Sequence, residues 1–351
     1  MSFIKKPIAR HPKLPKNKLG LTRRDYEGAL STLCAGCGHD SVSSAIIEAC
    51  FQLSIPAHRL AKLSGIGCSS KTPTYFLNKS HGFNSVHGRM PSVATGANLA
   101  NKDLYYLGVS GDGDTASIGL GQFSHVIRRR LNMVYICENN GTYGLTKGQF
   151  SATNDKESKN RKGVDNIFES IDLAAIAIQL GAGFVARSFS GDKDQLIPLI
   201  RAAMSYNGFA FIDVVSPCVT FNNHSESTKS YEYFREHNEA VGFLDIVPEN
   251  EEITVNYKEG KSVEIDVHDG SKMILHKLNK NYNPSSRRKA IGKINDSREK
   301  GEIITGLIYV DPDEEDLHKA LSTSDKPFNQ LTKKELSPGI KGLNQINKTF
   351  S

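Results

Sequence analysis

The sequence predicts an α/β fold in which helices cover both faces of a parallel β-sheet. Strand-like and helix-like segments alternate along most of the chain, and the strand-like segments are short, continuous apolar runs. Such runs are typical of parallel strands, because these are buried on both faces. The chain has 351 residues, which is enough for one large core or two modest ones.

The individual elements follow from apolar periodicity and from the turn residues between them. Residues 40–52 have the apolar spacing of a helix, and Asp40 is the expected N-cap. The other expected helices are residues 92–101, 117–130, 171–180 and 193–205, and the expected strands are residues 59–65, 104–110, 133–138, 183–188 and 209–216.

The chain is expected to have three regions: a basic arm (1–25), a main domain (26–224) and a C-terminal extension (225–351). We expect the extension to wrap the core or a partner subunit, with short strands at residues 253–257, 263–268 and 273–276 and a hairpin turn at residues 268–271.

The basic arm concentrates the positive charge of the chain. Residues 1–24 carry a charge of +8, whereas the whole chain carries +6, so the remainder sums to −2. The arm contains three prolines and little aromatic content, which favours a segment lying on a partner subunit over a nucleic-acid site. We therefore expect no nucleic-acid partner.

Two membrane-related signals are missing from the sequence. No run of about 18 apolar residues is present, and residues 1–7 lack the apolar core of a signal peptide. We therefore expect a cytoplasmic protein without a membrane partner, in which the six cysteines serve as thiols or metal ligands and not as disulfides.

The most informative motif is Gly111-Asp112-Gly113-Asp114, followed by Asn139-Asn140. Each half directly follows an expected buried strand, where open α/β sheets bind ligands. An Asp carboxylate, an Asn amide oxygen and a nearby carbonyl suit Mg²⁺, which often carries substrate phosphates, and glycine lets the backbone approach a phosphate. The spacing resembles the thiamine diphosphate motif; the alternative is two ordinary Gly/Asn turns.

Four of the cysteines are candidate metal ligands. Cys34 and Cys37 form a CxxC around a Gly turn, while Cys68 and Cys218 each follow an expected strand. In a parallel sheet these strand ends lie on the same edge as Asp112, so the four thiols can converge. Four thiolates fit zinc or a [4Fe–4S] cluster, and an electron-transfer cluster has a purpose beside a carbanion-forming cofactor. Cys50 and Cys137 lie in apolar segments and are expected to pack in the core.

Taken together, the motifs resemble the β subunit of the 2-oxoacid:ferredoxin oxidoreductases, with the 2-oxoglutarate type most similar. The resemblance covers about residues 26–235 and rests on CAGCGH, GIGCSS, His87-Gly-Arg89, GDGD, ENNGTYGLTKGQ and the segment 221–231, in that order. It implies a thiamine diphosphate-binding fold, with residues 26–224 binding thiamine diphosphate, Mg²⁺ and a [4Fe–4S] cluster.

The resemblance also implies residue roles. Asp112, Asn140 and the carbonyl of Thr142 would hold Mg²⁺, and Cys34, Cys37, Cys68 and Cys218 would bind the cluster. The residues that would border the cofactor or its pocket are Ile66, Gly67, Cys68, Ser69, His87, Gly111, Gly113, Asp114, Tyr143, Gly144, Leu145 and Thr146. Lys71 and Lys147 are candidates to pair with substrate carboxylates; each is equally well explained as an exposed lysine.

The implied activity is coenzyme A-dependent oxidative decarboxylation of a 2-oxoacid, 2-oxoglutarate being favoured, with electrons passed to ferredoxin. The carboxylate that activates thiamine is expected from an α or fused αγ subunit, so this chain alone should be catalytically incomplete in an αβ or (αβ)₂ assembly. Two alternatives remain at this stage: a non-oxidative thiamine-dependent decarboxylase or acyl transferase with a structural zinc, and a binding protein with degenerate sites, against which the intact Asp112/Asn140 pair weighs.

Overall fold

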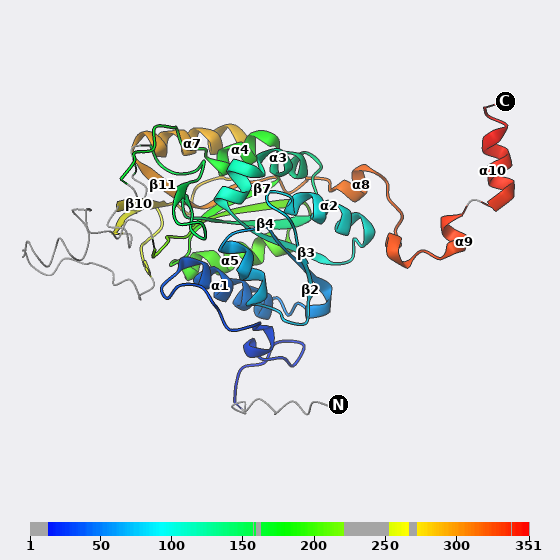
Figure 1. Cartoon of the computed structure of the whole chain (residues 1–351), viewed down its shortest axis with the longest axis horizontal. Coiled ribbons are helices and arrows are strands. Elements are labelled where there is room, and N and C mark those ends of the chain that lie inside the picture. Colours follow the sequence, from blue (N-terminus) through cyan, green and yellow to red (C-terminus); the bar gives the residue numbers. More distant parts are fainter. Residues whose placement is uncertain are drawn as a thin grey trace, which may run out of the picture.

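The computed structural model describes residues 13–156, 158, 163–220, 253–266, 272–337 and 339–350, and these form a nine-stranded sheet between two layers of helices (Figure 1). The strand order is β2-β1-β3-β4-β8-β7-β11-β10-β9. The strands are β1 (Leu60–Ser64), β2 (His81–Asn84), β3 (Tyr105–Gly111), β4 (Met133–Asn139), β7 (Phe184–Phe189), β8 (Phe209–Val215), β9 (Ser262–Asp266), β10 (Lys272–Lys277) and β11 (Glu302–Val310). A separate ribbon pairs β5 (Thr142–Tyr143) with β6 (Gln149–Phe150).

The strands from β2 to β7 are parallel, as the sequence predicts. Beyond β7 the sheet is mixed: β11 is antiparallel to β7, β10 is parallel to β11, and β9 is antiparallel to β10. Because β1, β3, β4 and β8 are consecutive neighbours, the loops that follow their carboxyl ends meet at one edge of the sheet.

The helices divide between the two faces of the sheet. One face carries α1 (Gly38–Gln52) and α5 (Lys193–Ser205), and the other carries α2 (Met90–Ala100), α3 (Leu120–Arg128), α4 (Leu173–Leu180) and α7 (Arg287–Glu299) (Figure 1). Alternate residues of β4 serve the two cores: Tyr135 packs with α3 and α4, whereas Ile136 packs with α1 and α5. The short turns are η1 (Arg23–Tyr26), η2 (Ala57–Arg59), η3 (Ser69–Thr74), the π-helical η4 (Gly113–Ile118) and η5 (Phe328–Gln330).

The structure corrects three expectations. Helix α1 begins at Gly38 with Cys37 as its N-cap, so the predicted cap at Asp40 is wrong. Residues 253–257 do not form a strand. Strand β11 and helix α7 were not predicted, and together with β9 and β10 they add an edge to the main sheet. The predicted turn at residues 268–271 and residues 1–12 of the arm lie outside the described residues.

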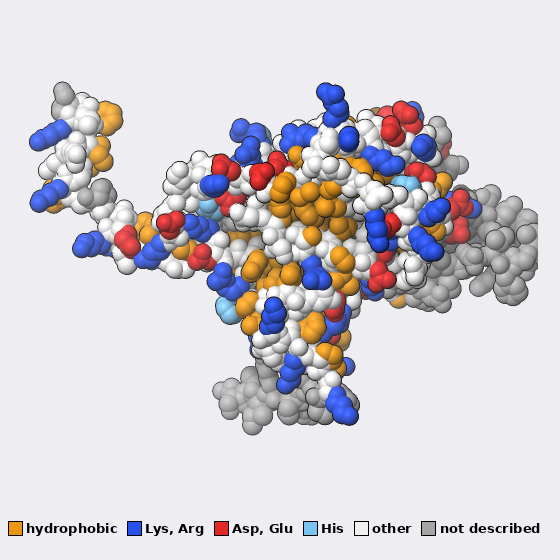
Figure 2. Space-filling model, turned by 180° about the vertical axis from the view of Figure 1, so that it is seen from behind, with side chains coloured by type: hydrophobic (Ala, Val, Ile, Leu, Met, Phe, Trp, Pro, Cys, Tyr) orange, Lys and Arg blue, Asp and Glu red, His pale blue; other side chains and the backbone are white. Residues whose placement is uncertain are grey.

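The C-terminal segment leaves the body of the molecule. Helices α8 (Leu317–Ala320), α9 (Lys333–Leu336) and α10 (Gly339–Asn347) lead away from the sheet (Figure 1). Ile340, Leu343 and Ile346 form an exposed apolar stripe on α10 (Figure 2). Within the residues that the structure describes, no helix is both long and apolar enough to cross a membrane.

Candidate functional site

A cleft of about 120 Å³ opens at the carboxyl edge of the sheet, above β1, β3 and β4. It collects all fifteen residues that the sequence analysis expected to border the cofactor, and adds two that it did not. The lining residues are His39, Ile66, Gly67, Cys68, Ser69, His87, Gly111, Asp112, Gly113, Asp114, Glu138, Asn140, Thr142, Tyr143, Gly144, Leu145 and Thr146.

Asp112 is the buried anion of this cleft. Its side chain is 1% exposed. The Ser151 and Thr153 hydroxyls donate to Oδ2, the latter at 2.7 Å, and the Asn140 N–H donates to Oδ1 at 3.3 Å. Burial raises the pKa of Asp112, and these hydrogen bonds oppose the rise. Among the described residues no Lys, Arg or His forms an ion pair with this carboxylate, so a bound cation would supply the charge that the protein does not.

Asn140 and Thr142 stand next to this carboxylate in a compact turn. The Thr142 N–H donates to Asn140 Oδ1 at 3.1 Å, and Gly141 adopts φ +71° between them. The turn brings one amide oxygen and the backbone of Thr142 to the side of the cleft where Asp112 lies. An oxygen-rich set of this kind fits Mg²⁺.

Two glycines of the cleft lining stand where other residues would not fit. A Cβ on Gly113 would lie 2.6 Å from the Tyr143 ring, whose O–H donates to the Gly113 carbonyl at 2.9 Å. Gly67 has φ +119°, a conformation that L side chains rarely adopt. Both positions therefore require glycine, one for close packing and the other for its backbone conformation.

Asp114 holds His87 in place. The Asp114 Oδ1 atom lies 2.5 Å from His87 Nδ1 and accepts from the Gly88 N–H at 2.8 Å, while Oδ2 accepts from the Ser110 hydroxyl at 2.8 Å. Both oxygens of the Asp114 carboxylate thus have hydrogen-bond partners within the protein. The carboxylate orients the His87 imidazole, which is 43% exposed at the mouth of the cleft.

His39 and Glu138 line the cleft but were missed by sequence reasoning. Burial lowers the pKa of His39 to about 4 and raises the pKa of Glu138 well above its usual value. Glu138 Oε2 lies 3.6 Å from His39 Nδ1, which is 2.6 Å from Ser216 Oγ, and both Glu138 oxygens lie 3.0 Å from the Thr72 hydroxyl. One signal was available: Glu138 is a charged residue at the end of an apolar strand.

The four candidate thiols converge beside the cleft. Burial raises the pKa of Cys218 to about 11, with Cys68 and Cys34 adding to the rise. Burial likewise raises the pKa of Cys37, to which Cys218 contributes. Each thiol therefore lies within electrostatic reach of at least one other, and Cys68 also lines the cleft. Cys50 and Cys137 are fully buried in the core, as expected.

The thiols are not arranged around a single point. No three His, Cys, Asp or Glu side chains in the described ranges lie close enough together to hold one metal ion. A structural zinc requires four ligands at about 2.0–2.3 Å from one ion.

The two candidate lysines lie outside the cleft lining. Lys147 is exposed at the tip of the β5–β6 ribbon, where it adopts φ +78°. Lys71 is half-buried in η3, close enough to Cys68 to counteract the rise of its pKa that burial causes. The motif at residues 221–231 lies outside the described residues.

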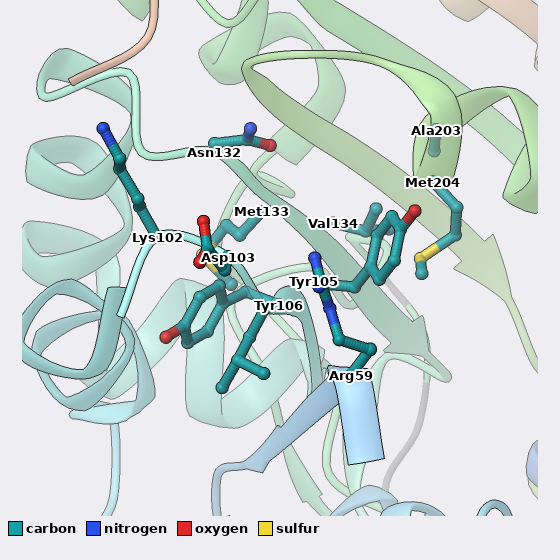
Figure 3. A pocket seen from close by; sticks show the side chains of 11 residues that line it. Arg59, Lys102, Asp103, Tyr105, Tyr106, Asn132, Met133, Val134, Ala203 and Met204 are labelled. Atoms are coloured by element: carbon teal, nitrogen blue, oxygen red, sulfur yellow. The ribbon is translucent and has the colours of Figure 1, made fainter. Parts of the chain in front are cut away.

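A second hollow, of about 280 Å³, opens at the opposite edge of the sheet (Figure 3). Arg59, Lys102 and Tyr105 line it near the amino ends of β1 and β3. It is larger than the cleft, but none of the predicted site residues lies there. The candidate site is therefore chosen by the convergence of Asp112, Asn140 and Cys68 and not by the size of the hollow.

Comparisons with known proteins agree with this fold. Residues 65–214 match the family described as thiamine pyrophosphate enzyme, C-terminal TPP binding domain. The parallel sheet with helices on both faces is thus a thiamine diphosphate-binding α/β fold.

Relatives identify the family within this class. The chain is 38% identical over 189 residues to the 2-oxoglutarate synthase subunit KorB of Methanocaldococcus jannaschii, covering 69% of that protein and 54% of this chain. It is 40% identical over 191 residues to the 2-oxoacid:ferredoxin oxidoreductase subunit beta of a Sulfolobus species, covering 63% of that protein and 54% of this chain. The chain belongs to the β-subunit family of the 2-oxoacid:ferredoxin oxidoreductases.

A solved structure extends the likeness to most of the chain. The 2-oxoglutarate:ferredoxin oxidoreductase from Magnetococcus marinus, with 2-oxoglutarate, coenzyme A and succinyl-CoA bound, superposes with a TM-score of 0.68 at 28% identity. The superposition covers 89% of this chain and 90% of that one. By sequence, in contrast, the chain matches less than two thirds of the length of the Sulfolobus relative.

Proposed function

We propose that this chain is the β subunit of a cytoplasmic enzyme that oxidatively decarboxylates 2-oxoglutarate with coenzyme A and passes the electrons to ferredoxin. Thiamine diphosphate would occupy the cleft, with Mg²⁺ on Asp112, Asn140 and the Thr142 carbonyl. Cys34, Cys37, Cys68 and Cys218 would bind a [4Fe–4S] cluster. The observation that carries the proposal is the position of Cys68, which lines the cleft and lies within electrostatic reach of Cys34.

The residues around the cleft have distinct tasks in this proposal. Thiamine diphosphate, when bound, supplies an electron sink for decarboxylation, and the cluster takes up electrons one at a time. Asp112 supplies the negative charge for the metal. Gly67 would leave the backbone open to phosphate oxygens, Gly113 makes room for the Tyr143 ring, and Asp114 orients His87 toward the cleft mouth.

The place of the thiols beside the cleft favours the cluster over the alternative of a structural zinc. Cys68 lines the cleft, and Cys34 and Cys218 lie within electrostatic reach of it. Four thiolates suit a [4Fe–4S] cluster, and an electron acceptor has a use beside a carbanion-forming cofactor, whereas a structural zinc has none there.

Exposed apolar side chains at the cleft mouth support a partner subunit. Val86 adjoins His87, Leu145 lines the cleft, and Ile118 ends the π-helical turn after Asp114; all three are more than half exposed. Apolar side chains beside a polar site are typical of an interface. We propose an α or fused αγ subunit as the partner, in an αβ or (αβ)₂ assembly. The six unpaired cysteines suit the reducing cytoplasm.

The proposal is tested by the metal content of the anaerobically purified protein. We expect iron and acid-labile sulfide in equal amounts, and an EPR signal of a reduced [4Fe–4S] cluster after addition of dithionite. One stoichiometric zinc with a silent spectrum would contradict the cluster and favour the non-oxidative enzyme. Zinc analysis of the same sample is the control.

The choice of 2-oxoglutarate rests on a cation for its second carboxylate. Lys71 is the better placed of the two candidates, because its charge reaches Cys68, which lines the cleft, whereas Lys147 is on an exposed tip. We expect Lys71→Met to lower kcat/KM for 2-oxoglutarate by about tenfold or more relative to pyruvate, as the loss of a charged hydrogen bond of 1.5–3 kcal/mol would. Steady-state kinetics of the complete enzyme measure this, with Lys147→Met as the matched control. Equal losses on both substrates would remove the argument.

A further inference from the structure

A chain of hydrogen bonds runs behind Asp112 to a buried ion pair in the neighbouring strands. Arg187 of β7 is 7% exposed; its Nε donates to Asp213 Oδ2 at 2.8 Å and its second terminal nitrogen donates to Asp172 Oδ1 at 2.7 Å. Asp213, on β8, is 1% exposed, and its Oδ1 accepts from Asn139 Nδ2 at 3.1 Å. The proposed function does not use these residues.

Asp213 fixes the orientation of the Asn139 amide. A carboxylate paired with a guanidinium can only accept hydrogen bonds, so the NH₂ group of Asn139 must face it. The amide oxygen of Asn139 therefore points the other way, where it lies 3.0 Å from Thr153 Oγ1.

Thr153 has three neighbouring oxygens for a single proton. Its hydroxyl oxygen lies 2.7 Å from Asp112 Oδ2, 2.8 Å from Ser151 Oγ and 3.0 Å from Asn139 Oδ1. A hydroxyl donates only once, so a hydrogen bond from Thr153 to the Asn139 amide replaces its hydrogen bond to the Asp112 carboxylate. Asp112 Oδ2 also accepts from the Ser151 hydroxyl. With Thr153 turned toward it, both lone pairs of this oxygen are in use.

We propose that Asp213 sets the metal affinity of the site. It orients the Asn139 amide so that the amide oxygen competes with Asp112 for the hydrogen bond donated by Thr153. The inference rests on the proposed Mg²⁺ site. Asp213, Asn139 and Thr153 are positioning residues: a cation that binds Asp112 gains a free lone pair when Thr153 turns to Asn139. Partners behind a metal ligand commonly change affinity by about 10–100-fold.

The substitution Asp213→Asn reverses the arrangement. The new side chain keeps an oxygen for Arg187 and presents an N–H to Asn139, so the Asn139 amide turns over and its NH₂ faces Thr153. Thr153 then loses the amide as an acceptor and can donate only to Asp112 or to the Ser151 hydroxyl. We expect the Mg²⁺ concentration for half-maximal thiamine diphosphate binding to rise about tenfold. Isothermal titration calorimetry of the full chain at a series of Mg²⁺ concentrations measures it.

Four further variants separate this role from a general structural one. In a Thr153→Val background, Asp213→Asn should cause no further rise in the required Mg²⁺ concentration, because no hydroxyl remains to be redirected. A Thr153→Ser background should restore the effect.

Asn139→Ala leaves the Arg187–Asp213 pair intact and should give the same tenfold rise in the required Mg²⁺ concentration. This variant keeps the test decisive if Asp213→Asn does not fold. Asp172→Asn removes the other carboxylate of Arg187 and should leave the Mg²⁺ dependence unchanged.

The outcomes distinguish this inference from the proposed function. Wild-type protein that binds thiamine diphosphate with Mg²⁺, together with Asp213→Asn and Asn139→Ala variants of unchanged Mg²⁺ dependence, would overturn the positioning role alone. The positioning role would also be overturned if Asp213→Asn raised the required Mg²⁺ concentration just as much in the Thr153→Val background. Wild-type protein that binds no thiamine diphosphate at millimolar Mg²⁺ would overturn the proposed cofactor site, and this inference with it.

Discussion

Asp112→Asn is expected to raise the Mg²⁺ concentration needed for thiamine diphosphate binding by at least about a hundredfold. Partners behind a metal ligand change affinity by about 10–100-fold, and the loss of a direct anionic ligand should cost no less. Asp112 is 1% exposed and, within the described ranges, has no ion-pair partner. Removing its charge therefore removes the main electrostatic attraction for a cation. Calorimetric titration of Mg²⁺ at saturating thiamine diphosphate measures the change.

The same substitution should have the opposite effect on the metal-free protein. Burial raises the pKa of Asp112, which means that folding opposes its charge. A neutral amide of the same size should leave the metal-free fold equally stable or more stable, so weaker cofactor binding cannot be attributed to misfolding. Asp316→Asn, at the half-buried N-cap of α8 far along the chain from the cleft, is the control and should not change the Mg²⁺ dependence. Unchanged Mg²⁺ dependence in Asp112→Asn would contradict the assignment.

The convergence of the site residues was predictable because it depends on sheet topology. Cys68, Asp112, Asn140 and Cys218 all follow strands that read as buried apolar runs, and parallel strands deliver their carboxyl ends to one edge. The structure places these strands side by side in the order β1-β3-β4-β8. The sequence alone thus allowed the cleft to be predicted without the strand order, because any order would keep the four ends on the same edge.

The surroundings of Asp112 were not predictable in the same way. Ser151 and Thr153 reach the carboxylate from the chain that follows the β5–β6 ribbon, 39 and 41 residues away. No periodicity or spacing in the sequence links them to Asp112. His39 and Glu138 were missed for a related reason: they meet only because α1 begins one residue after Cys37 and turns His39 toward the end of β4.

Of the sheet edge beyond β7, strand β11 was missed, whereas the strands predicted at residues 263–268 and 273–276 are confirmed as β9 and β10. Strand β11 contains Gly306 at φ +124° and a register shift between Leu307 and Tyr309. A bulge and a glycine interrupt the alternation by which a strand is recognised. Apart from Glu302 the segment is uncharged and mostly apolar, so a strand signal was present there, directly after the charged residues 281–302.

Cys218→Ser is expected to remove most of the iron and sulfide from the protein. A [4Fe–4S] cluster is held by four thiolates, and Cys218 lies within electrostatic reach of Cys68, Cys34 and Cys37. A serine hydroxyl is a harder and more weakly acidic ligand, so the cluster should be lost or altered. Iron and sulfide per chain, together with the EPR spectrum of the reduced protein, measure the effect.

Cys50→Ala provides the matched control, because Cys50 is equally a thiol but is fully buried within α1 among apolar side chains. It should lower stability slightly and leave iron, sulfide and the spectrum unchanged. Full iron in Cys218→Ser would show that the thiols beside the cleft do not bind a cluster. Cys218→Ser also tests whether the cluster and the cofactor cleft can be separated, because Cys68 lines the cleft and Cys218 does not. This variant should abolish electron transfer to ferredoxin. It should leave the Mg²⁺ dependence of thiamine diphosphate binding unchanged.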